Sequence, residues 1–109
     1  MTIQEANNKH SELFEKALEL LQKKRVDYAD NVDPFANFRQ SKLCGVEPSK
    51  GSFIRMMDKV SRMARLMSKG GVGGVADESL ADTVIDLCNY AVITLLLYQE
   101  ELGSKKECV

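Results

Sequence analysis

Apolar side chains recur every three or four residues in three stretches of this chain, which is the spacing of helices that each have one apolar face. The first stretch predicts a helix over residues 8–27. Glu12 and Glu15 fall on the opposite side of this helix at about 100° per residue, so we interpret them as solvent-facing rather than as a metal-binding pair. The predicted apolar face consists of Leu13, Phe14, Ala17, Leu18 and Leu21.

The second stretch predicts a helix over residues 49–69, directly after Pro48. Methionine dominates its apolar face, and flexible Met side chains are typical of an adaptable core or of an interface. The glycine-rich run at 70–74 lacks the Lys-Ser/Thr sequel of a phosphate-binding loop, so we interpret it as a connection between helices. The predicted buried face consists of Phe53, Met56, Met57, Val60, Met63, Ala64 and Met67.

The third stretch predicts a helix over residues 77–102, with Asp77 as its N-cap and Gly103 as its stop. Its second half is apolar nearly all round, which is typical of a central helix in a bundle. The longest apolar run, Tyr90 to Tyr98, is far shorter than the roughly 20 residues that a membrane span needs. We therefore expect no contact with a membrane.

Turn-forming residues and aromatic residues are mixed in the segment 28–48, between the first two predicted helices. The aromatics favour an ordered loop, in which Tyr28, Phe35 and Phe38 pack inward while Asn37 and Arg39 are presented to a ligand. A loop that merely covers the core is an equally good interpretation. A connection of this length is long for a compact domain and is commonly functional.

Composition limits the size and class of the protein. The 109 residues, 44% hydrophobic and 28% charged, predict one all-α domain over residues 1–109, a small bundle of three main helices and one long ordered loop, with frayed ends at 1–7 and 104–109. A domain this small has a thin stability margin, so we expect a homodimer or higher oligomer.

Charge and cysteine content exclude some function classes. The formal net charge of −1 argues against a nucleic-acid binder, which is normally strongly basic. Three cysteines without metal-ligand spacing are typical of a reduced, cytoplasmic protein. The first residues do not have the basic and then apolar pattern of a secretory signal, which also favours a cytoplasmic location.

The candidate chemistry lies on the third predicted helix, where Glu78, Asp82, Asp86 and Asn89 form one stripe. No Lys or Arg occurs between residues 77 and 103 to relieve the repulsion between these acids. The same sector of the helix then turns apolar, so the stripe is not expected to be wholly open to water. Such carboxylates favour either a hard cation or basic partners, and a structural salt-bridge network remains the alternative to a ligand or metal role.

A row of cations on the second predicted helix provides the natural partner for this stripe. Arg55, Lys59 and Arg62 share one face at i, i+4 and i+7, and such a row could hold a polyphosphate. Cations beside carboxylates form the complement that a Mg²⁺-nucleotide requires. A solvated face with Asp58 paired to Arg62 is the simpler alternative.

Several sequence blocks resemble a known family, the nucleotide-modification-associated domain 1 family of small proteins common in bacteriophage genomes. The resemblance covers about residues 24–101. The blocks are Lys24-Arg-Val-Asp27-Tyr28, Asp33-Pro-Phe-Ala-Asn-Phe-Arg39, Gly45-Val-Glu-Pro48, Ile54-Arg-x-x-Asp58-Lys59-x-x-Arg62 and Glu78-Ser-x-x-Asp82-Thr-x-x-Asp86-Leu-x-Asn89-Tyr90-Ala91.

That family is similar to the all-α nucleoside triphosphate pyrophosphohydrolases of the MazG and dimeric dUTPase kind, which are oligomeric helical bundles that use Mg²⁺. The resemblance implies Glu-x-x-Glu on one helix and Glu-x-x-Asp on the next. This chain departs from that pattern, because Glu78 and Asp82 are four residues apart and the second helix offers only Asp58.

Two functions follow as hypotheses. The first is a Mg²⁺-dependent pyrophosphohydrolase of phage nucleotide metabolism, with Glu78, Asp82 and Asp86 as catalytic residues that hold the metal together with Asp58. The second is an oligomeric nucleotide-binding protein that sequesters nucleotides, or a signalling nucleotide, without hydrolysis; the incomplete carboxylate set favours it. In the enzyme, a metal-bound water attacks. The residues assigned to the nucleotide are Arg55, Lys59, Arg62, Asn37, Arg39 and Asn89.

Overall fold

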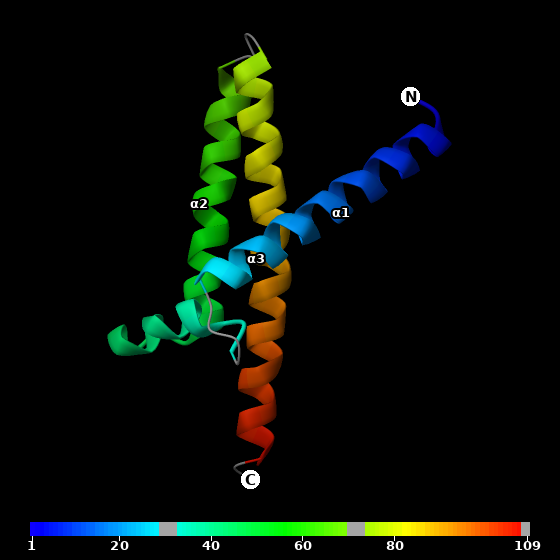
Figure 1. Cartoon of the computed structure of the whole chain (residues 1–109). Coiled ribbons are helices and arrows are strands. Elements are labelled where there is room, and N and C mark those ends of the chain that lie inside the picture. Colours follow the sequence, from blue (N-terminus) through cyan, green and yellow to red (C-terminus); the bar gives the residue numbers. More distant parts are fainter. Residues whose placement is uncertain (29–32, 70–73, 108–109) are drawn as a thin grey trace.

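Four helices make up the regular structure of the residues that the structure describes (Figure 1). The computed structural model describes residues 1–28, 33–69 and 74–107, without the side chains of residues 27–28, 74–79 and 105–107. Within this part there is no strand, so the predicted all-α class is confirmed. The helices are α1 (Ile3–Tyr28), the 3₁₀ helix η1 (Ala36–Cys44), α2 (Pro48–Ser68) and α3 (Gly74–Glu107).

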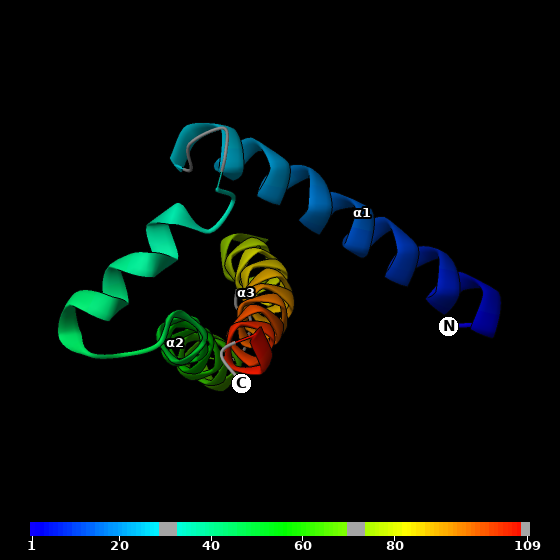
Figure 2. The ribbon, with the colours of Figure 1, turned by 90° about the horizontal axis from the view of Figure 1, so that it is seen from below.

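The helices α2 and α3 run antiparallel as a long hairpin, and α1 crosses α3 near its middle (Figure 1). Seen from below, α1 and η1 lie on the same side of this hairpin (Figure 2). The arrangement is extended: its radius of gyration is 16.6 Å, against about 13 Å for a compact domain of this length. A single chain therefore leaves much of its helical surface uncovered.

Two helix starts follow from capping. Thr2 and Glu5 form a reciprocal capping box, in which the Glu5 N–H donates to Thr2 Oγ1 at 3.1 Å and the Thr2 N–H donates to Glu5 Oε2 at 3.2 Å. This box starts α1 at Ile3, five residues before the predicted start. At α2, Pro48 occupies the first turn and Glu101 of α3 accepts hydrogen bonds from the Ser49 N–H and Oγ–H at 2.9 and 2.6 Å.

The segment between α1 and α2 was predicted to be mostly irregular, and this expectation needs correction. Residues Ala36–Cys44 form η1, which ends at Gly45 in the left-handed region (φ 72°). The backbone hydrogen bonds of η1 are local, and the segment has no recurring apolar pattern from which a helix could be predicted. The predicted inward packing of Phe35 and Phe38 is confirmed, whereas the side chain of Tyr28 lies outside the described part. The predicted end of the third helix at Leu102 is also too early, because α3 continues through Gly103 to Glu107.

The apolar core is small and lies where α1 and η1 meet the hairpin. Phe35, Phe38, Ile93 and Leu97 form its buried cluster, and the half-buried side chains of Leu21 and Tyr90 pack against them. Beside this cluster, α2 and α3 are joined by a polar contact. The fully buried Ser52 Oγ lies 2.8 Å from Thr94 Oγ1, and the Thr94 hydroxyl donates to the Tyr90 carbonyl at 2.7 Å.

The predicted buried faces of the first two helices are largely exposed in the single chain. On α1, Ala17 is buried, but Leu13, Phe14 and Leu18 remain about half exposed. On α2, the buried residues are Pro48, Ser49 and Ser52. The apolar spacing predicted the two helices correctly. Their apolar stripes stay partly exposed because a single neighbouring helix covers only one side of each stripe. Within the predicted face of α2, Met56 and Met63 are half-buried, and the members that stay exposed are Phe53, Met57, Val60, Ala64 and Met67.

Candidate functional site

A cavity of about 360 Å³ opens between α1, η1 and the hairpin, which is within the usual range for a small-molecule site. All four helical elements, together with Pro34, contribute to its wall. Four predicted site residues line it: Asn37, Arg55, Asp86 and Asn89. The remaining lining residues are Leu21, Lys24, Arg25, Pro34, Phe38, Tyr90 and Ile93.

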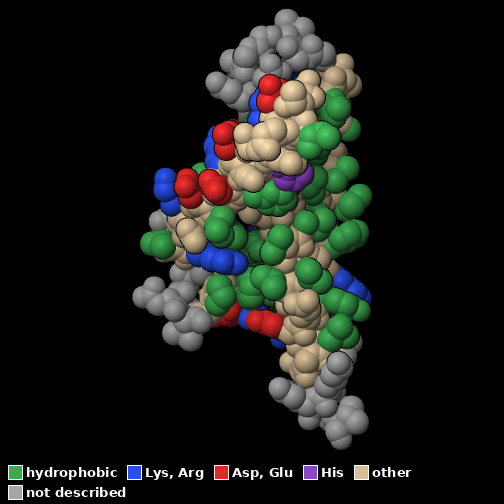
Figure 3. Space-filling model, turned by 90° about the vertical axis from the view of Figure 1, so that its right-hand side faces the viewer, with side chains coloured by type: hydrophobic (Ala, Val, Ile, Leu, Met, Phe, Trp, Pro, Cys, Tyr) green, Lys and Arg blue, Asp and Glu red, His purple; other side chains and the backbone are tan. Residues whose placement is uncertain are grey.

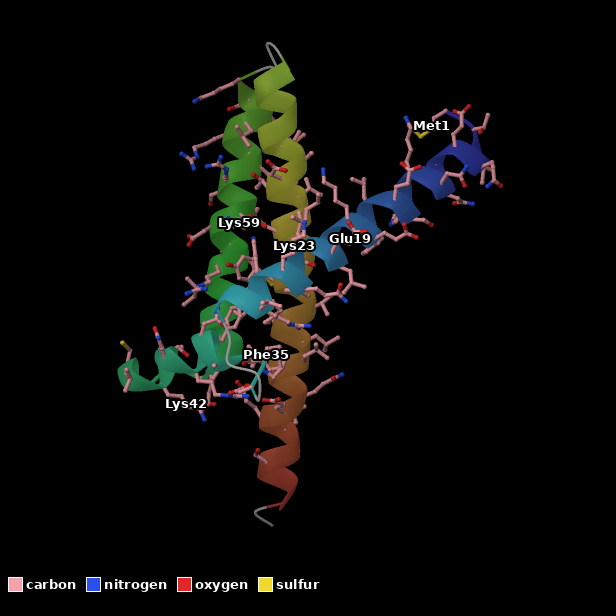
Figure 4. All side chains as sticks on the ribbon, viewed as in Figure 1. Met1, Glu19, Lys23, Phe35, Lys42 and Lys59 are labelled. Carbon is pink, nitrogen blue, oxygen red and sulfur yellow. The ribbon has the colours of Figure 1, made fainter. Side chains whose placement is uncertain are left out.

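Asp86 lies at the point where three helices meet. Its Oδ1 is 3.1 Å from Lys24 Nζ of α1, and its Oδ2 is 3.2 Å from Lys59 Nζ of α2. The carboxylate is three-quarters buried, while the Lys24 side chain is about half exposed. Both carboxylate oxygens therefore have an ammonium partner. Asp86 takes part in a salt-bridge network, which was the alternative to a ligand or metal role for the carboxylate stripe. Lys59 lies on α2 near the level where α1 crosses the hairpin (Figure 4).

Another polar contact positions the cavity wall. The Asn89 side-chain amide donates to the Ala17 carbonyl of α1 at 3.0 Å. Because Ala17 is itself buried, this bond holds α1 closely against α3. Asn89, which was expected to contact a nucleotide, thus also fixes the helix that supplies Lys24 and Arg25 to the cavity.

Two arginines of the cavity lie over aromatic rings. The Arg55 guanidinium carbon is 5.3 Å from the centroid of the Phe38 ring, and that of Arg25 is 5.7 Å from the centroid of the Phe35 ring. Phe38 in turn meets Tyr90 edge to face, with 6.0 Å between the ring centroids. Phe35 lies between η1 and α3, below the carboxyl end of α1 (Figure 4). These stacked contacts restrict the guanidinium groups without using their N–H donors.

The charges around the cavity do not balance. Lys24, Arg25 and Arg55 carry three positive charges, and Asp86 carries one negative charge. Lys59 adds a further positive charge just behind Asp86. Among the lining residues that the structure describes, the charge is therefore net positive, which suits an anionic ligand.

Several predicted site residues lie elsewhere. Arg39 donates to Asp33 at 2.6 Å through Nε and to Glu100 at 3.1 Å through one terminal nitrogen, which ties η1 to α3. The hydrogen bond from Arg39 lowers the pKa of Asp33, and the same bond raises the pKa of Arg39. Arg62 donates to the buried Thr83 Oγ1 at 3.1 Å, again between α2 and α3. These two arginines hold helices together and do not line the cavity.

The predicted carboxylate stripe is only partly assembled. Asp58 and Asp82 have exposed side chains outside the cavity lining, and the side chain of Glu78 lies outside the described residues. Among the side chains that the structure describes, no three His, Cys, Asp or Glu residues form a group suited to a metal ion. Since both oxygens of Asp86 already pair with lysines, the described residues do not fit a Mg²⁺ site there.

Sequence reasoning missed the contribution of α1 to the site. Lys24 and Arg25 occur in the first block of the family resemblance, but no role was assigned to them. Tyr90 also lines the cavity, although the sequence pattern does not indicate it as a site residue. A helical period shows which residues share a face of one helix, but not where another helix crosses it.

Comparison with protein-family models, with curated proteins and with solved structures finds no significant match to this chain. The proposed family and the activity that it implies therefore stay predictions.

One helical segment, Leu80–Ser104, has the length and the mean hydropathy (1.6) of a membrane span. The length of the longest uninterrupted apolar run predicted no membrane span. The mean hydropathy differs from that measure because it averages over a window that also includes polar residues. Core helices of soluble proteins can have the same length and composition, so the cytoplasmic location stays a prediction.

Proposed function

We propose that the chain binds a nucleotide, or a closely similar phosphate ester of a planar ring, in the cavity between α1, η1 and the hairpin, without hydrolysing it. The observation that carries the proposal is the set of three cations, Lys24, Arg25 and Arg55, around a cavity of about 360 Å³ that also has aromatic and amide walls.

The phosphates belong on the cationic side of the cavity. Guanidinium groups present N–H donors in a planar fork that suits phosphate oxygens. The Arg55 guanidinium carbon lies 5.3 Å from the centroid of the Phe38 ring, and a cation–π contact uses none of the N–H donors that such bonds need. Asp86 would repel a phosphate, but its ammonium partners Lys24 and Lys59 offset that charge.

The ring of the ligand belongs beside the aromatic and amide wall. Tyr90 and Phe38 provide apolar ring surfaces, and Asn37 can both donate and accept hydrogen bonds with a base or sugar. Phe38 and Tyr90 are packed against each other in the core cluster, so binding does not have to order these two rings.

The binding hypothesis is favoured over Mg²⁺-dependent hydrolysis by the state of Asp86. A hydrolase of this design needs clustered carboxylates whose oxygens face a metal. Here each oxygen of Asp86 faces a lysine at 3.1–3.2 Å, and Asp58 and Asp82 stand apart from the cavity.

Equilibrium binding tests the proposal. The purified chain is titrated calorimetrically with nucleoside mono-, di- and triphosphates in EDTA. We expect at least one nucleotide to bind, and Arg55→Gln to weaken it by roughly 10–100-fold, since a hydrogen bond to a charged group contributes about 1.5–3 kcal/mol. Arg65→Gln is the matched control, because Arg65 is exposed on the same helix outside the cavity. Equal loss in both variants would contradict binding in this cavity.

A further inference from the structure

An uncovered apolar row runs along α2. Its members are spaced four, three, four and three residues apart, which is the heptad spacing of helices that pack side by side. The large side chains of the row are 43–63% exposed in the single chain. The row consists of Phe53, Met57, Val60, Ala64 and Met67.

A second row with the same spacing runs along α3. Successive members are four, three, four, three and four residues apart. Leu95 and Tyr98 are about half exposed, and Leu102 is 39% exposed. The row consists of Val84, Cys88, Ala91, Leu95, Tyr98 and Leu102.

Both rows lie on the side of the hairpin that faces away from α1 and η1. On α2, Lys59 contacts Asp86 of α3 and Arg55 lies over Phe38 of η1. These two cations are about 100° and about 140° around the helix from Val60. On α3, Asn89 contacts α1 and is about 120° from Leu95. Figure 2 shows α1 and η1 together on one side of the pair, and Figure 3 shows hydrophobic side chains along the edge turned away from them. We name the eleven residues of the two rows the outer face.

We infer that the outer face is covered by a second copy of this chain, so that two hairpins pack as a four-helix arrangement around a twofold axis. Seven large side chains of the face are roughly half exposed, and at roughly 100 Å² each they would bury roughly 700 Å² per copy. A standard stable interface buries about 800 Å² per partner, so the area suits such a dimer.

The absence of charge on the outer face favours a second copy over other occupants. In a twofold interface the same patch meets itself, so a charged row would face like charge. All eleven residues of the two rows are uncharged, and Ser61 and Ser68 flank the α2 row. The exposed Lys50 lies beyond the row, at the N-terminal end of α2. A helix that lies on a membrane surface is instead typically rimmed by Lys and Arg. The exposed cations Arg55, Arg62 and Arg65 point away from this face.

Small residues would let the helices of the two copies approach closely. Ala64 lies in the α2 row, and Ala91 lies in the α3 row among larger neighbours. Alternation of large and small side chains allows two such surfaces to interdigitate. The cavity described above opens on the opposite side of the hairpin, so a dimer formed this way leaves both cavities accessible.

Molar mass by light scattering, at micromolar concentrations of the full chain, tests the inference. We expect twice the 12.2 kDa of one chain. Val60→Asp and Leu95→Asp each place two carboxylates in the interface and should raise the dissociation constant on the order of 100-fold or more. Leu43→Asp is the control, because Leu43 is 89% exposed on η1 and away from the outer face. A dimer that persists in both outer-face variants would overturn the proposed surface.

Two further measurements cover the case in which these variants do not fold. The urea midpoint of the wild-type chain should rise with protein concentration, because dimerisation stabilises only the folded state. A midpoint that is independent of concentration, with a mass of 12.2 kDa, would overturn the inference. A monomer that instead sediments with phosphatidylcholine–phosphatidylglycerol vesicles would overturn it in favour of a membrane as the occupant.

Discussion

Replacing Asp86 with Asn distinguishes a salt-bridge network from a metal site. In the structure this carboxylate joins Lys24 and Lys59, and through them α1 and α2, to α3. The neutral amide keeps the shape of the side chain but leaves two ammonium groups facing each other without an anion. A metal site makes the opposite prediction, because removing one of several mutually repelling carboxylates leaves folding intact or slightly improves it.

The expected loss in the free energy of unfolding is about 1–2 kcal/mol. The pair with Lys24 is at the surface, where such pairs contribute about 0.2–1 kcal/mol. The pair with Lys59 is more enclosed, since the two side chains are 29% and 25% exposed, and it contributes more. Neither is buried fully enough to reach the about 3–5 kcal/mol that is lost when a truly buried pair is broken.

Urea unfolding of wild type, Asp86→Asn and Asp82→Asn, each with Mg²⁺ and with EDTA, measures this loss. Asp82 is exposed, so its replacement should change stability by no more than about 0.5 kcal/mol. Mg²⁺ should not alter the ranking. An Asp86→Asn variant as stable as wild type, together with a Mg²⁺-dependent stabilisation that only wild type shows, would refute the salt-bridge interpretation.

Two further predictions concern the packing of η1. A Cβ on Gly51 would lie 3.1 Å from Ser41 Cβ, and Ser41 is held in place because its hydroxyl donates to the Val46 carbonyl. Gly51→Ala should therefore not give the gain of about 1 kcal/mol in the free energy of unfolding that this change gives at an ordinary helical site. Gly103→Ala, which meets nothing within 4 Å, should be stabilising; equal gains in urea melts would contradict this account. The pKa of Asp33 lies below its ordinary 3.8 because of Arg39, so Asp33→Asn should cost up to about 1 kcal/mol at pH 7. That cost should vanish as the pH falls below 3.8 and through the lowered pKa of Asp33 in the folded state. A stability difference between wild type and Asp33→Asn that persists in acid would exclude the ion pair as its cause.

The helices were predictable from the sequence because their apolar periods are regular, but their ends and their partners were less so. The Thr2–Glu5 capping box is a readable start signal that was overlooked. Gly103 suggested a stop, yet a glycine ends a helix only where the backbone turns left-handed, and α3 continues through it. The end of η1 coincides with Gly45 in the left-handed region, but the packing of η1 against α2 is a tertiary contact that no local pattern reveals.

The candidate site was predicted in part for the same reason. Asp86 and Arg55 were identified from single-helix spacing, and both line the cavity. Lys24 belongs to a different helix, and its contact with Asp86 spans 62 positions of sequence. Arg39 was assigned to a ligand because it follows an aromatic loop, but Asp33 and Glu100 are its partners in the fold. Such pairings depend on the positions at which the helices cross, and the apolar spacing within one helix does not predict these positions.

The central claim is that the cavity binds a nucleotide and does not hydrolyse it. The most direct test measures binding and release of pyrophosphate or phosphate in parallel, on one preparation of the full chain, over a panel of nucleoside triphosphates with Mg²⁺ and with EDTA. We predict saturable binding in both buffers and no product above the no-protein control. Turnover that requires Mg²⁺ and is lost in Asp86→Asn would contradict the account.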